Sequence, residues 1–440
     1  VNTFVESSAR QIYKTVLKIV AMSVIRGTIE RLSDEGLGTI RASRREILVP
    51  YTAPGDVVEV ARWRRKKKKL IATDFKVIEE SPIRTEPKCP YFGVCGGCLL
   101  QHLPYEKQIE FKSEKLSRYI GTDVDVIPSP VIYGHRNRID VVISTGGIGF
   151  RRYGTWWDAV DIEECPVFGK TSRKVLKSLR EFIEDEKPTL YEIRKNAGFL
   201  RYIVMREGKF TGELMVNLVT SEGKLPESFP EYFPYATSIY WSVNRTESDV
   251  SYGDVERYWG EPFIREKLDD VTYLIHPNSF FQTNSYQAVN LVRKVAELVE
   301  GEKVLDLYSG VGTFGIYLAK RGFKVEGIEI NPFAVEMAKK NAQINGVDAE
   351  FRVGEDKDVN SLSEYDTVVV DPPRAGLHPK LVRKILKDRP ETLVYVSCNP
   401  KTLSQNLKEL SEGYKIEEAV GLDMFPHTPH VEAVLKLRKV

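Results

Sequence analysis

The sequence is poor in cysteine and has no long apolar run. Only five of its 440 residues are cysteines, and this odd number argues against a disulfide framework. No apolar run approaches the roughly 18 residues needed to span a bilayer, because even the short stretch 17–25 is interrupted by Lys18. We therefore expect a soluble cytoplasmic protein without membrane contact, and we expect it to be a monomer.

The charges are segregated along a chain of otherwise ordinary globular composition. With 42% apolar and 29% charged residues, collagen, a disordered tail protein and a coiled-coil rod are excluded. Residues 1–80 hold 16 Lys and Arg against 10 Asp and Glu, whereas the remainder holds 48 against 52. Seven of the eight residues in 62–69 are basic. Such a run neutralises phosphates, so Arg64, Lys66, Lys67 and Lys68 are candidate nucleic-acid contacts; the alternative is a solvated loop or hairpin tip without a ligand.

The pattern of apolar and turn residues divides the chain into four segments. Residues 1–22 form an N-terminal extension that looks detachable. Residues 23–82 are expected to form a small β-barrel of the oligonucleotide-binding type, with strands at 24–30, 36–40, 46–49, 56–60 and 71–78. Residues 83–268 mix strands, such as 140–144 and 214–219, with a helix at 171–183, which predicts an α+β middle domain.

Residues 269–440 alternate strands with helices, the pattern of a doubly wound parallel sheet. Strands are expected at 303–307, 324–328, 367–370 and 393–396, and helices at 313–321, 334–345 and 381–387. Segments 419–424 and 431–437 look like a terminal hairpin. The fold class is therefore α/β: a Rossmann-like domain with a terminal hairpin, preceded by the small barrel and the α+β domain.

A glycine-rich loop follows the first strand of this last domain. It begins at Asp306, includes Gly310 and leads into a helix, where glycines let the backbone approach a ligand closely. Alone it could bind a dinucleotide or no ligand at all. Glu329 at the next strand tip could grip ribose hydroxyls, and the segment from Asp371 to Arg374, Asp-Pro-Pro-Arg, is common in nucleobase methyltransferases. These three loops together favour S-adenosylmethionine.

Four cysteines lie close enough in sequence to share one centre. Cys89, Cys95 and Cys98 are tightly spaced with glycines between the last two, and Cys165 is the nearest fourth. Four thiolates suit zinc or an iron–sulfur cluster equally by spacing alone. The alternative is that these cysteines are simply buried.

Cys398 stands apart, beyond the tip of a predicted parallel strand and therefore at the same crevice as the glycine loop. A thiolate that adds to carbon 6 of a pyrimidine makes carbon 5 nucleophilic toward a methyl sulfonium, and a base must then remove the carbon 5 proton. Glu432, at the start of the last strand, is the best candidate for that base. The alternatives are a core cysteine and an exposed surface carboxylate.

These residues carry a resemblance to a known family. The chain resembles the iron–sulfur-containing RNA (uracil-C5)-methyltransferases that bear an N-terminal TRAM domain, over about residues 23–440. The matching motifs, besides the four cysteines and the barrel, are 149–152 (GFRR), 279–284 (SFFQTN), 306–310 (DLYSG), 371–374 (DPPR), 397–400 (SCNP) and 430–432 (HVE).

The resemblance implies the roles of the site residues. It implies a [4Fe-4S] cluster on the four cysteines, Cys398 as nucleophile and Glu432 as proton acceptor. Cofactor contacts fall on Gln282, Tyr308, Glu329 and Asp371, beside Asp306 and Gly310 in the glycine loop, and RNA contacts on Arg136 and Arg138. For these arginines the alternative is a surface salt-bridge pair. The sequence departs from bacterial relatives at Thr313, where they often have Asn.

The resemblance leaves the RNA substrate open. We expect uridine 54 in the T-loop of tRNA, as in the archaeal type of the enzyme, with ribosomal RNA as the second candidate. An RNA cytosine-C5 methyltransferase generally carries a second cysteine where this chain has Asp371-Pro-Pro-Arg374, so that alternative is disfavoured. A non-catalytic RNA-binding protein is disfavoured by the presence of Cys398 and Glu432 beside an intact cofactor loop.

Overall fold

The computed structural model describes residues 24–42, 45–355 and 359–440. The N-terminal extension expected at residues 1–22 lies outside these residues. The chain divides into two compact units, the first made of 1–87 and 99–104 and the second of 88–98 and 105–440. No helix in the described residues is long and apolar enough to cross a membrane.

The first unit is built on one six-stranded sheet with the strand order β1-β5-β6-β4-β3-β2. Its strands are β1 (Ile25–Thr28), β2 (Arg31–Leu32), β3 (Gly38–Ala42), β4 (Arg45–Val49), β5 (Val57–Lys66) and β6 (Lys69–Glu79). Strands β1 and β2 follow each other directly in the chain, yet they are the two end strands of this order, β1 beside β5 and β2 beside β3. The sheet therefore closes on itself. The expected small barrel is therefore present, around a core that includes Ile40, Val49 and Val58.

The second unit contains two large sheets. The first has the order β10-β9-β8-β11-β12-β13-β14. Its strands are β8 (Arg138–Ser144), β9 (Gly147–Arg151), β10 (Ala159–Asp161), β11 (Leu200–Glu207), β12 (Leu214–Thr220), β13 (Ser238–Val243) and β14 (Asp254–Gly260). Helix α3 (Thr171–Glu186) and the 3₁₀ turn η1 (Phe229–Tyr232) pack on it, and the hairpin of β15 (Ile264–Leu268) and β16 (Val271–Ile275) leads to the last sheet.

The last sheet has eight strands in the order β19-β18-β17-β20-β21-β23-β22-β7. Its strands are β17 (Lys303–Leu307), β18 (Lys324–Glu329), β19 (Ala349–Val353), β20 (Thr367–Val370), β21 (Thr392–Ser397), β22 (Tyr414–Leu422), β23 (Glu432–Lys439) and β7 (Val126–Ile127). The four strands predicted from sequence form its parallel centre, and β23 runs antiparallel beside β21. The predicted terminal hairpin is thus the β22–β23 pair.

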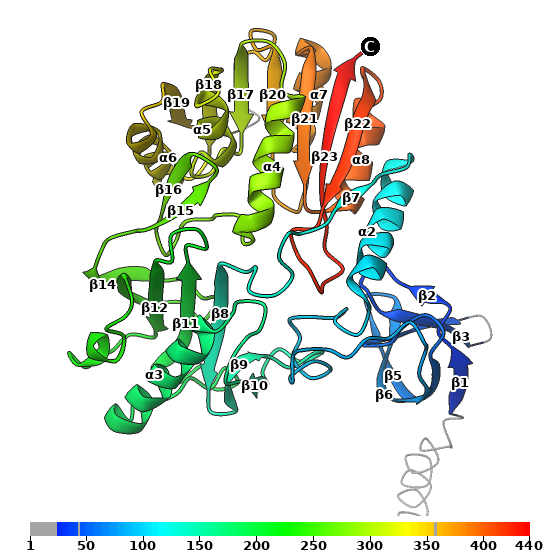
Figure 1. Cartoon of the computed structure of the whole chain (residues 1–440), viewed down its shortest axis with the longest axis vertical. Coiled ribbons are helices and arrows are strands. Elements are labelled where there is room, and N and C mark those ends of the chain that lie inside the picture. Colours follow the sequence, from blue (N-terminus) through cyan, green and yellow to red (C-terminus); the bar gives the residue numbers. More distant parts are fainter. Residues whose placement is uncertain (1–23, 43–44, 356–358) are drawn as a thin grey trace, which may run out of the picture. The chain divides into compact units, whose positions relative to one another are not determined.

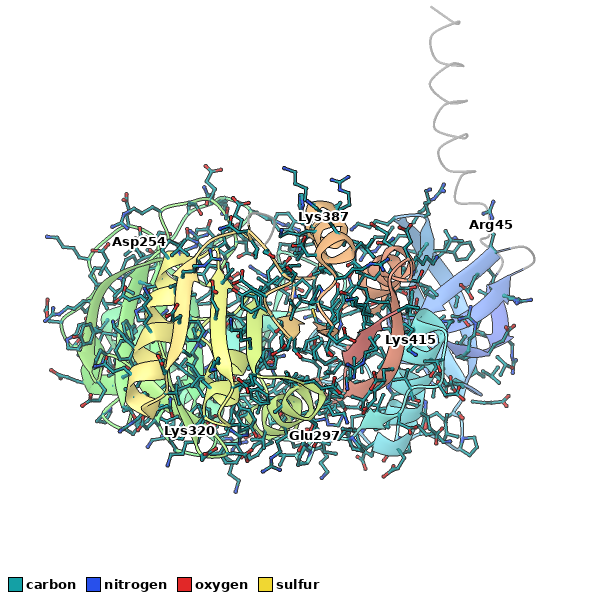
Figure 2. The ribbon with its side chains drawn as sticks, turned by 90° about the horizontal axis from the view of Figure 1, so that it is seen from above. Arg45, Asp254, Glu297, Lys320, Lys387 and Lys415 are labelled. Atoms are coloured by element: carbon teal, nitrogen blue, oxygen red, sulfur yellow. The ribbon has the colours of Figure 1, made fainter. Side chains whose placement is uncertain are left out.

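Helices cover both faces of this sheet. Alternate strand residues point to opposite sides: Val304 and Val394 pack in one core, and Leu305 and Leu393 in the other. The first core is covered by α4 (Ser285–Leu298), α5 (Thr313–Ala319) and α6 (Pro332–Asn345), and the second by α7 (Pro379–Asp388), α8 (Pro400–Leu410) and α2 (Tyr105–Ile120). Figure 2 shows this arrangement, with Glu297 on α4 and Lys387 on α7 at opposite sides of the strands.

Two elements from the segment expected in the middle domain belong with the last sheet. Strand β7 pairs in parallel with β22, Gly421 opposite Val126, and α2 packs against α8 (Figure 1). Residues 105–127 therefore extend the doubly wound domain.

Candidate active site

Four of the predicted side chains meet at one edge of the eight-stranded sheet. Asp306 is the penultimate residue of β17 and Glu329 is the last residue of β18, while Asp371 and Cys398 directly follow β20 and β21. These strands are parallel neighbours, with Leu307 opposite both Ile328 and Val370. Their carboxyl ends therefore lie at the same edge, which is where open α/β sheets bind ligands.

The glycine loop between β17 and α5 turns through left-handed backbone at three positions. Tyr308, Gly310 and Gly312 have φ values of 63°, 54° and 83°. The Gly310 N–H donates to Glu329 Oε2 at 3.1 Å, and the other oxygen of Glu329 accepts from the Asn331 N–H at 2.9 Å. A Cβ added at Gly310 would meet nothing within 4 Å. The loop therefore leaves open space beside a carboxylate, as binding of a hydroxyl-bearing ligand requires.

Two further carboxyl groups lie at this edge, Asp306 buried and Asp371 half-buried. Asp306 accepts a hydrogen bond from the Gly315 N–H at 2.9 Å, but its Oδ1 has no hydrogen-bond partner among the described residues. Burial, opposed by that hydrogen bond, raises the pKa of Asp306 to about 8, and the charges of Asp371 and Glu329 add to the rise. Burial raises the pKa of Asp371 to about 7. The site thus offers acceptors suited to ribose hydroxyls or to a cation.

Gln282 lies in the segment between β16 and α4, which is fixed to the glycine loop through aromatic residues. The ring of Phe281 packs on Tyr273 at 5.5 Å, and the Tyr273 hydroxyl donates to the carbonyl of Thr313 at 2.8 Å. Asn137 donates to the Gln282 carbonyl at 2.7 Å. Gln282 is buried, so the segment is held in place at the border of the site.

Cys398 and Glu432 face each other across two antiparallel strands. Ser397 at the end of β21 pairs with Ala433, so the next positions, Cys398 and Glu432, are directly opposed. Glu432 is only 3% exposed, which shows that the alternative of a surface carboxylate is wrong. Cys398 is half-buried at the strand end. The register alone thus brings the predicted nucleophile and base together.

The surroundings of the two groups raise the pKa of each. Burial, together with the nearby charges of Glu432 and Asp371, raises the pKa of Cys398 to about 11. Burial and then Asp371 raise the pKa of Glu432 well above its usual range. Arg374 opposes both shifts, because its guanidinium lies close to both groups and donates a hydrogen bond to the Cys398 sulfur.

Arg374 is a site residue that the sequence analysis did not single out, although it belongs to the Asp-Pro-Pro-Arg motif. Its backbone is tied to the segment after Cys398: Asn399 Nδ2 donates to the Arg374 carbonyl at 2.8 Å, and Thr402 Oγ1 donates to it at 3.3 Å. Asn399 also caps α8 by accepting from the Lys401 N–H. The Asn-Pro pair after Cys398 therefore both starts a helix and anchors the loop that carries Arg374.

Arg136 and Arg138 occupy different environments. Arg138 forms an ion pair with Asp140, in which Nε and Oδ1 are separated by 2.7 Å. The alternative of a salt-bridged arginine therefore describes Arg138. Arg136 is half-buried, and its Nε has no partner among the described residues. Burial lowers the pKa of His430 to about 4 and the charge of Arg136 adds to this shift, while for Cys165 the same charge opposes the rise in pKa that burial causes. Only Arg136 therefore lies near the Cys398–Glu432 side of the site.

The basic run occupies the tip of the β5–β6 hairpin in the first unit. Lys66 pairs with Lys69, and the two turn residues Lys67 and Lys68 have φ values of 44° and 69°. Positive φ at both central residues is the geometry of a type I′ turn, which usually selects Asn-Gly. The basic side chains are exposed, including Arg64. The predicted contacts thus project from a hairpin as one basic tip.

The four cysteines of the predicted cluster lie in one neighbourhood of the second unit. Burial and then the charge of Cys89 raise the pKa of Cys95, and burial raises the pKa of Cys165 to about 11, with a smaller contribution from Cys95. Cys98 packs against the core that contains Cys165. All five cysteines of the chain are present as thiols. However, the described residues contain no group of three or more His, Cys, Asp or Glu side chains arranged to hold a metal ion.

Two family descriptions match separate parts of the chain. Residues 25–83 match the family described as tRNA (uracil(54)-C(5))-methyltransferase, TRAM domain, and residues 260–440 match the tRNA (Uracil-5-)-methyltransferase family. The chain is 62% identical over 413 residues to the tRNA (uracil(54)-C(5))-methyltransferase of Pyrococcus horikoshii, covering 94% of this chain and 100% of that protein. It is 44% identical to the 23S rRNA (uracil(747)-C(5))-methyltransferase of Pyrococcus abyssi, over 94% of this chain and 100% of that one.

A solved structure is similar over nearly the whole chain. The crystal structure of Pyrococcus abyssi tRNA (uracil-54, C5)-methyltransferase in complex with S-adenosyl-L-homocysteine matches with a TM-score of 0.87 and 60% sequence identity. The match covers 94% of this chain and 99% of the other. The α/β fold with its N-terminal barrel, expected from the sequence, is confirmed by this similarity.

Proposed function

The chain belongs to the tRNA (uracil-5-)-methyltransferase family, and we propose that it transfers a methyl group from S-adenosylmethionine to carbon 5 of uridine 54 in tRNA. The observation that carries this proposal is the opposition of Cys398 and Glu432 at the carboxyl edge of a sheet whose glycine loop lies beside the carboxyl groups of Asp306 and Glu329. Identity favours tRNA over ribosomal RNA, because the chain is 62% identical to a tRNA enzyme and 44% identical to an rRNA enzyme.

The chain's residues supply the nucleophile and the base of this reaction. After its thiol has lost a proton, Cys398 adds to carbon 6 of the uracil, and the ring becomes an enolate. Carbon 5 of the enolate attacks the methyl group of S-adenosylmethionine, the bond between that methyl group and the sulfonium sulfur breaks, and S-adenosylhomocysteine leaves. Glu432 then removes the carbon 5 proton, the carbon–sulfur bond breaks, and the electron pair returns to sulfur. Arg374 donates a hydrogen bond to the Cys398 sulfur and so favours the thiolate, both before it adds to the uracil and after it leaves.

We assign the S-adenosylmethionine contacts to the residues around the glycine loop. Glu329 is placed for the ribose hydroxyls, because it already accepts hydrogen bonds from the N–H groups of Gly310 and Asn331 at the loop. Asp306 offers an unpartnered buried oxygen, and Asp371 a second, half-buried carboxyl group. We also assign contacts to Tyr308, which lies in the glycine loop, and to Gln282, which lies in the segment before α4.

RNA contacts are assigned to two places. The basic tip, with Arg64, Lys66, Lys67 and Lys68, supplies phosphate contacts from the barrel. Arg136 supplies a charge near the Cys398–Glu432 side of the site, whereas Arg138, which is paired with Asp140, contributes less. Phosphate contacts of this kind offset the few kcal/mol needed to unstack the target base.

We also propose that Cys89, Cys95, Cys98 and Cys165 hold a [4Fe-4S] cluster. The support for this is that the four thiols lie in one neighbourhood of the second unit. Four thiolates suit zinc or an iron–sulfur cluster, and the choice of the cluster rests on the resemblance of the sequence motifs to the iron–sulfur-containing family. The cluster would order the middle domain, and no step of the methyl transfer involves it.

The test uses radiolabelled S-adenosylmethionine with a tRNA transcript and a 23S rRNA fragment. The wild-type protein is expected to label the tRNA, with the label in 5-methyluridine at position 54, and a tRNA with cytidine at that position is the control. Cys398→Ala should bind S-adenosylmethionine but transfer no methyl group. Glu432→Gln should accumulate an RNA–protein adduct that survives denaturing electrophoresis.

Three results would contradict the proposal. If the rRNA fragment were labelled and the tRNA were not, the substrate would be ribosomal RNA and not tRNA. Near-normal turnover by Cys398→Ala would exclude the covalent scheme, and full activity of Glu432→Gln without any adduct would remove Glu432 from the role of base.

A further inference from the structure

One face of α2 is polar and yet buried. Tyr105, Gln108, Lys112 and Lys115 recur at intervals of three, four and three residues, which places them on one side of the helix. Lys112 is fully buried, Gln108 is 1% exposed and Lys115 is 8% exposed, while Tyr105 at the start of the helix is half-buried. Burying such groups is costly unless each finds a partner, so their partners show what the face is for.

Each of the four side chains has a hydrogen-bond partner in one short segment, residues 423–429. Lys112 Nζ donates to Asp423 Oδ1 at 2.5 Å and to the Phe425 carbonyl at 3.0 Å, and Lys115 Nζ donates to the Pro429 carbonyl at 2.8 Å. The two further bonds join the Tyr105 hydroxyl to Asp423 Oδ2 at 2.9 Å and the His427 N–H to Gln108 Oε1 at 2.9 Å.

This segment leads directly into the proposed base. It connects the end of β22 to the start of β23, where Leu422 pairs with Glu432. The connection is much longer than the roughly two to five residues of an ordinary hairpin, so the strands alone do not fix its path. His427 lies in the segment with a φ of 66°, a backbone conformation that is uncommon for residues other than glycine.

We propose that Lys112, Tyr105 and Gln108 are positioning residues that hold segment 423–431 so that the Glu432 carboxylate reaches the carbon 5 proton of the Cys398 adduct. The inference rests on the proposed function and adds to it. These residues touch no reacting atom; they act through the loop. Loss of their contacts slows proton removal and leaves the addition of Cys398 and the methyl transfer intact.

We call the contacts of Lys112, Tyr105 and Gln108 with segment 423–431 the α2 clamp. Its ionic character supports a role in positioning the loop more than a role in stabilising the fold. Lys112 and Asp423 are both 0% exposed. Replacing a buried ion pair by apolar side chains of similar volume often leaves a fold equally stable or more stable, so we assign to this pair and its oriented hydrogen bonds the selection of one loop geometry. The Lys112–Asp423 pair has such additional bonds, to Phe425 and from Tyr105.

The two steps can be measured separately in a single turnover with tRNA that carries tritium on carbon 5 of uracil and with methyl-labelled S-adenosylmethionine. Methyl incorporation reports the first step and tritium release the second. Lys112→Met and Tyr105→Phe should keep methyl incorporation within about twofold of wild type, and tritium release should slow roughly ten- to a hundredfold, as expected when a catalytic group is displaced by about an ångström. The denaturation-resistant adduct should accumulate in parallel.

Lys436→Met is the matched control. Lys436 is also buried and lies in the same hairpin, but its Nζ pairs with Glu300 at 2.6 Å and with Glu417 at 3.1 Å, toward the far end of β23. Its variant should lose comparable stability while tritium release keeps pace with methyl incorporation. Tyr105→Phe removes only a hydroxyl, so it keeps the test decisive if Lys112→Met fails to fold.

Two results would contradict the proposed role of the α2 clamp. One is that Tyr105→Phe slows methyl incorporation and tritium release equally. The other is that it releases tritium as fast as Lys436→Met does. Glu432→Gln is measured alongside to separate this failure from that of the proposed function. If Glu432→Gln traps no adduct, the role of Glu432 itself is wrong; if it does and the α2 variants do not, only the clamp is wrong.

Discussion

At the scale of single residues, Arg374 decides how readily the catalytic pair ionises. Both Cys398 and Glu432 must lose a proton to act, yet burial and neighbouring carboxylates raise the pKa of each. Arg374 is the positive group close to both. The guanidinium stabilises the thiolate and the carboxylate, so it moves both ionisations toward neutral pH.

We predict that Arg374→Met shifts the pH–rate profile to higher pH. Without the guanidinium the pKa of Cys398 and that of Glu432 both rise, so the fraction of active enzyme at neutral pH falls and recovers only as the pH increases. The expected loss at neutral pH is on the order of tenfold, small beside the roughly 10²–10⁴-fold that acid–base groups contribute.

The measurement is kcat/KM against pH for methyl transfer to tRNA. Arg383→Met, which removes an exposed arginine from α7, should leave the profile unchanged. An Arg374→Met profile that falls in height without moving along the pH axis would show that the arginine acts in RNA binding and not on the two ionisations.

At the scale of elements, the β5–β6 hairpin carries backbone strain in its turn. Lys67 and Lys68 occupy positions with positive φ that suit Asn and Gly. A lysine in left-handed backbone costs roughly 1 kcal/mol, so the turn is less stable than its geometry allows. Strain of this kind is often found at functional positions, which agrees with a role of the basic tip in binding RNA.

We predict that the double variant Lys67→Asn, Lys68→Gly is more stable but binds RNA less well. Relief of the turn should stabilise the protein by about 0.5–2 kcal/mol. Loss of two charges should lower the slope of log affinity against log salt by up to roughly two units and leave S-adenosylmethionine affinity unchanged. Thermal unfolding and RNA titrations at several salt concentrations measure both effects.

Lys76→Gln, an exposed charge removed from β6 away from the tip, controls for loss of charge alone. If the double variant kept the wild-type RNA affinity and salt slope, the basic tip would be a solvated hairpin without a ligand.

At the scale of the whole molecule, the chain passes between its two units around the first three cysteines. Residues 88–98 belong to the second unit, between segments of the first. They are tied to the seven-stranded sheet by the Gly96 N–H, which donates to the Arg151 carbonyl at 3.0 Å, and by the Tyr153 N–H, which donates to Val94 at 2.9 Å. A cluster on these cysteines would therefore join this crossing segment to Cys165 and to the middle domain.

We predict that anaerobically prepared protein is brown and contains iron and sulfide in place of zinc. Removing the cluster should lower the thermal midpoint by more than about 5 °C, because crosslinking of two segments is worth at least roughly 2 kcal/mol in a domain of this size. Binding of S-adenosylmethionine should survive, since its proposed contacts lie on the other sheet. Colourless, zinc-loaded protein from the same preparation would reverse the metal assignment.

The sequence by itself determined much of the last domain. Its strands and helices are local patterns, and the predicted strands 303–307 and 367–370 coincide with β17 and β20. Because parallel strands end at one edge, residues that follow their tips could be assigned to a common site without coordinates, which is how Glu329, Asp371 and Cys398 were identified. Glu432 was identified from the chemistry that Cys398 requires.

Only the tertiary structure decided what depends on pairing between distant segments. The antiparallel register of β23 places Glu432 opposite Cys398, and β7 joins the last sheet beside β22. Lys112 meets Asp423 across 311 positions of sequence. A polar stripe on a helix predicts a solvated face, because local spacing cannot encode whether a distant loop will cover it. Whether a side chain is buried, and which residues it contacts, depends on the folded chain. In this protein the polar face of α2 is covered by the segment that leads to Glu432, the proposed catalytic base.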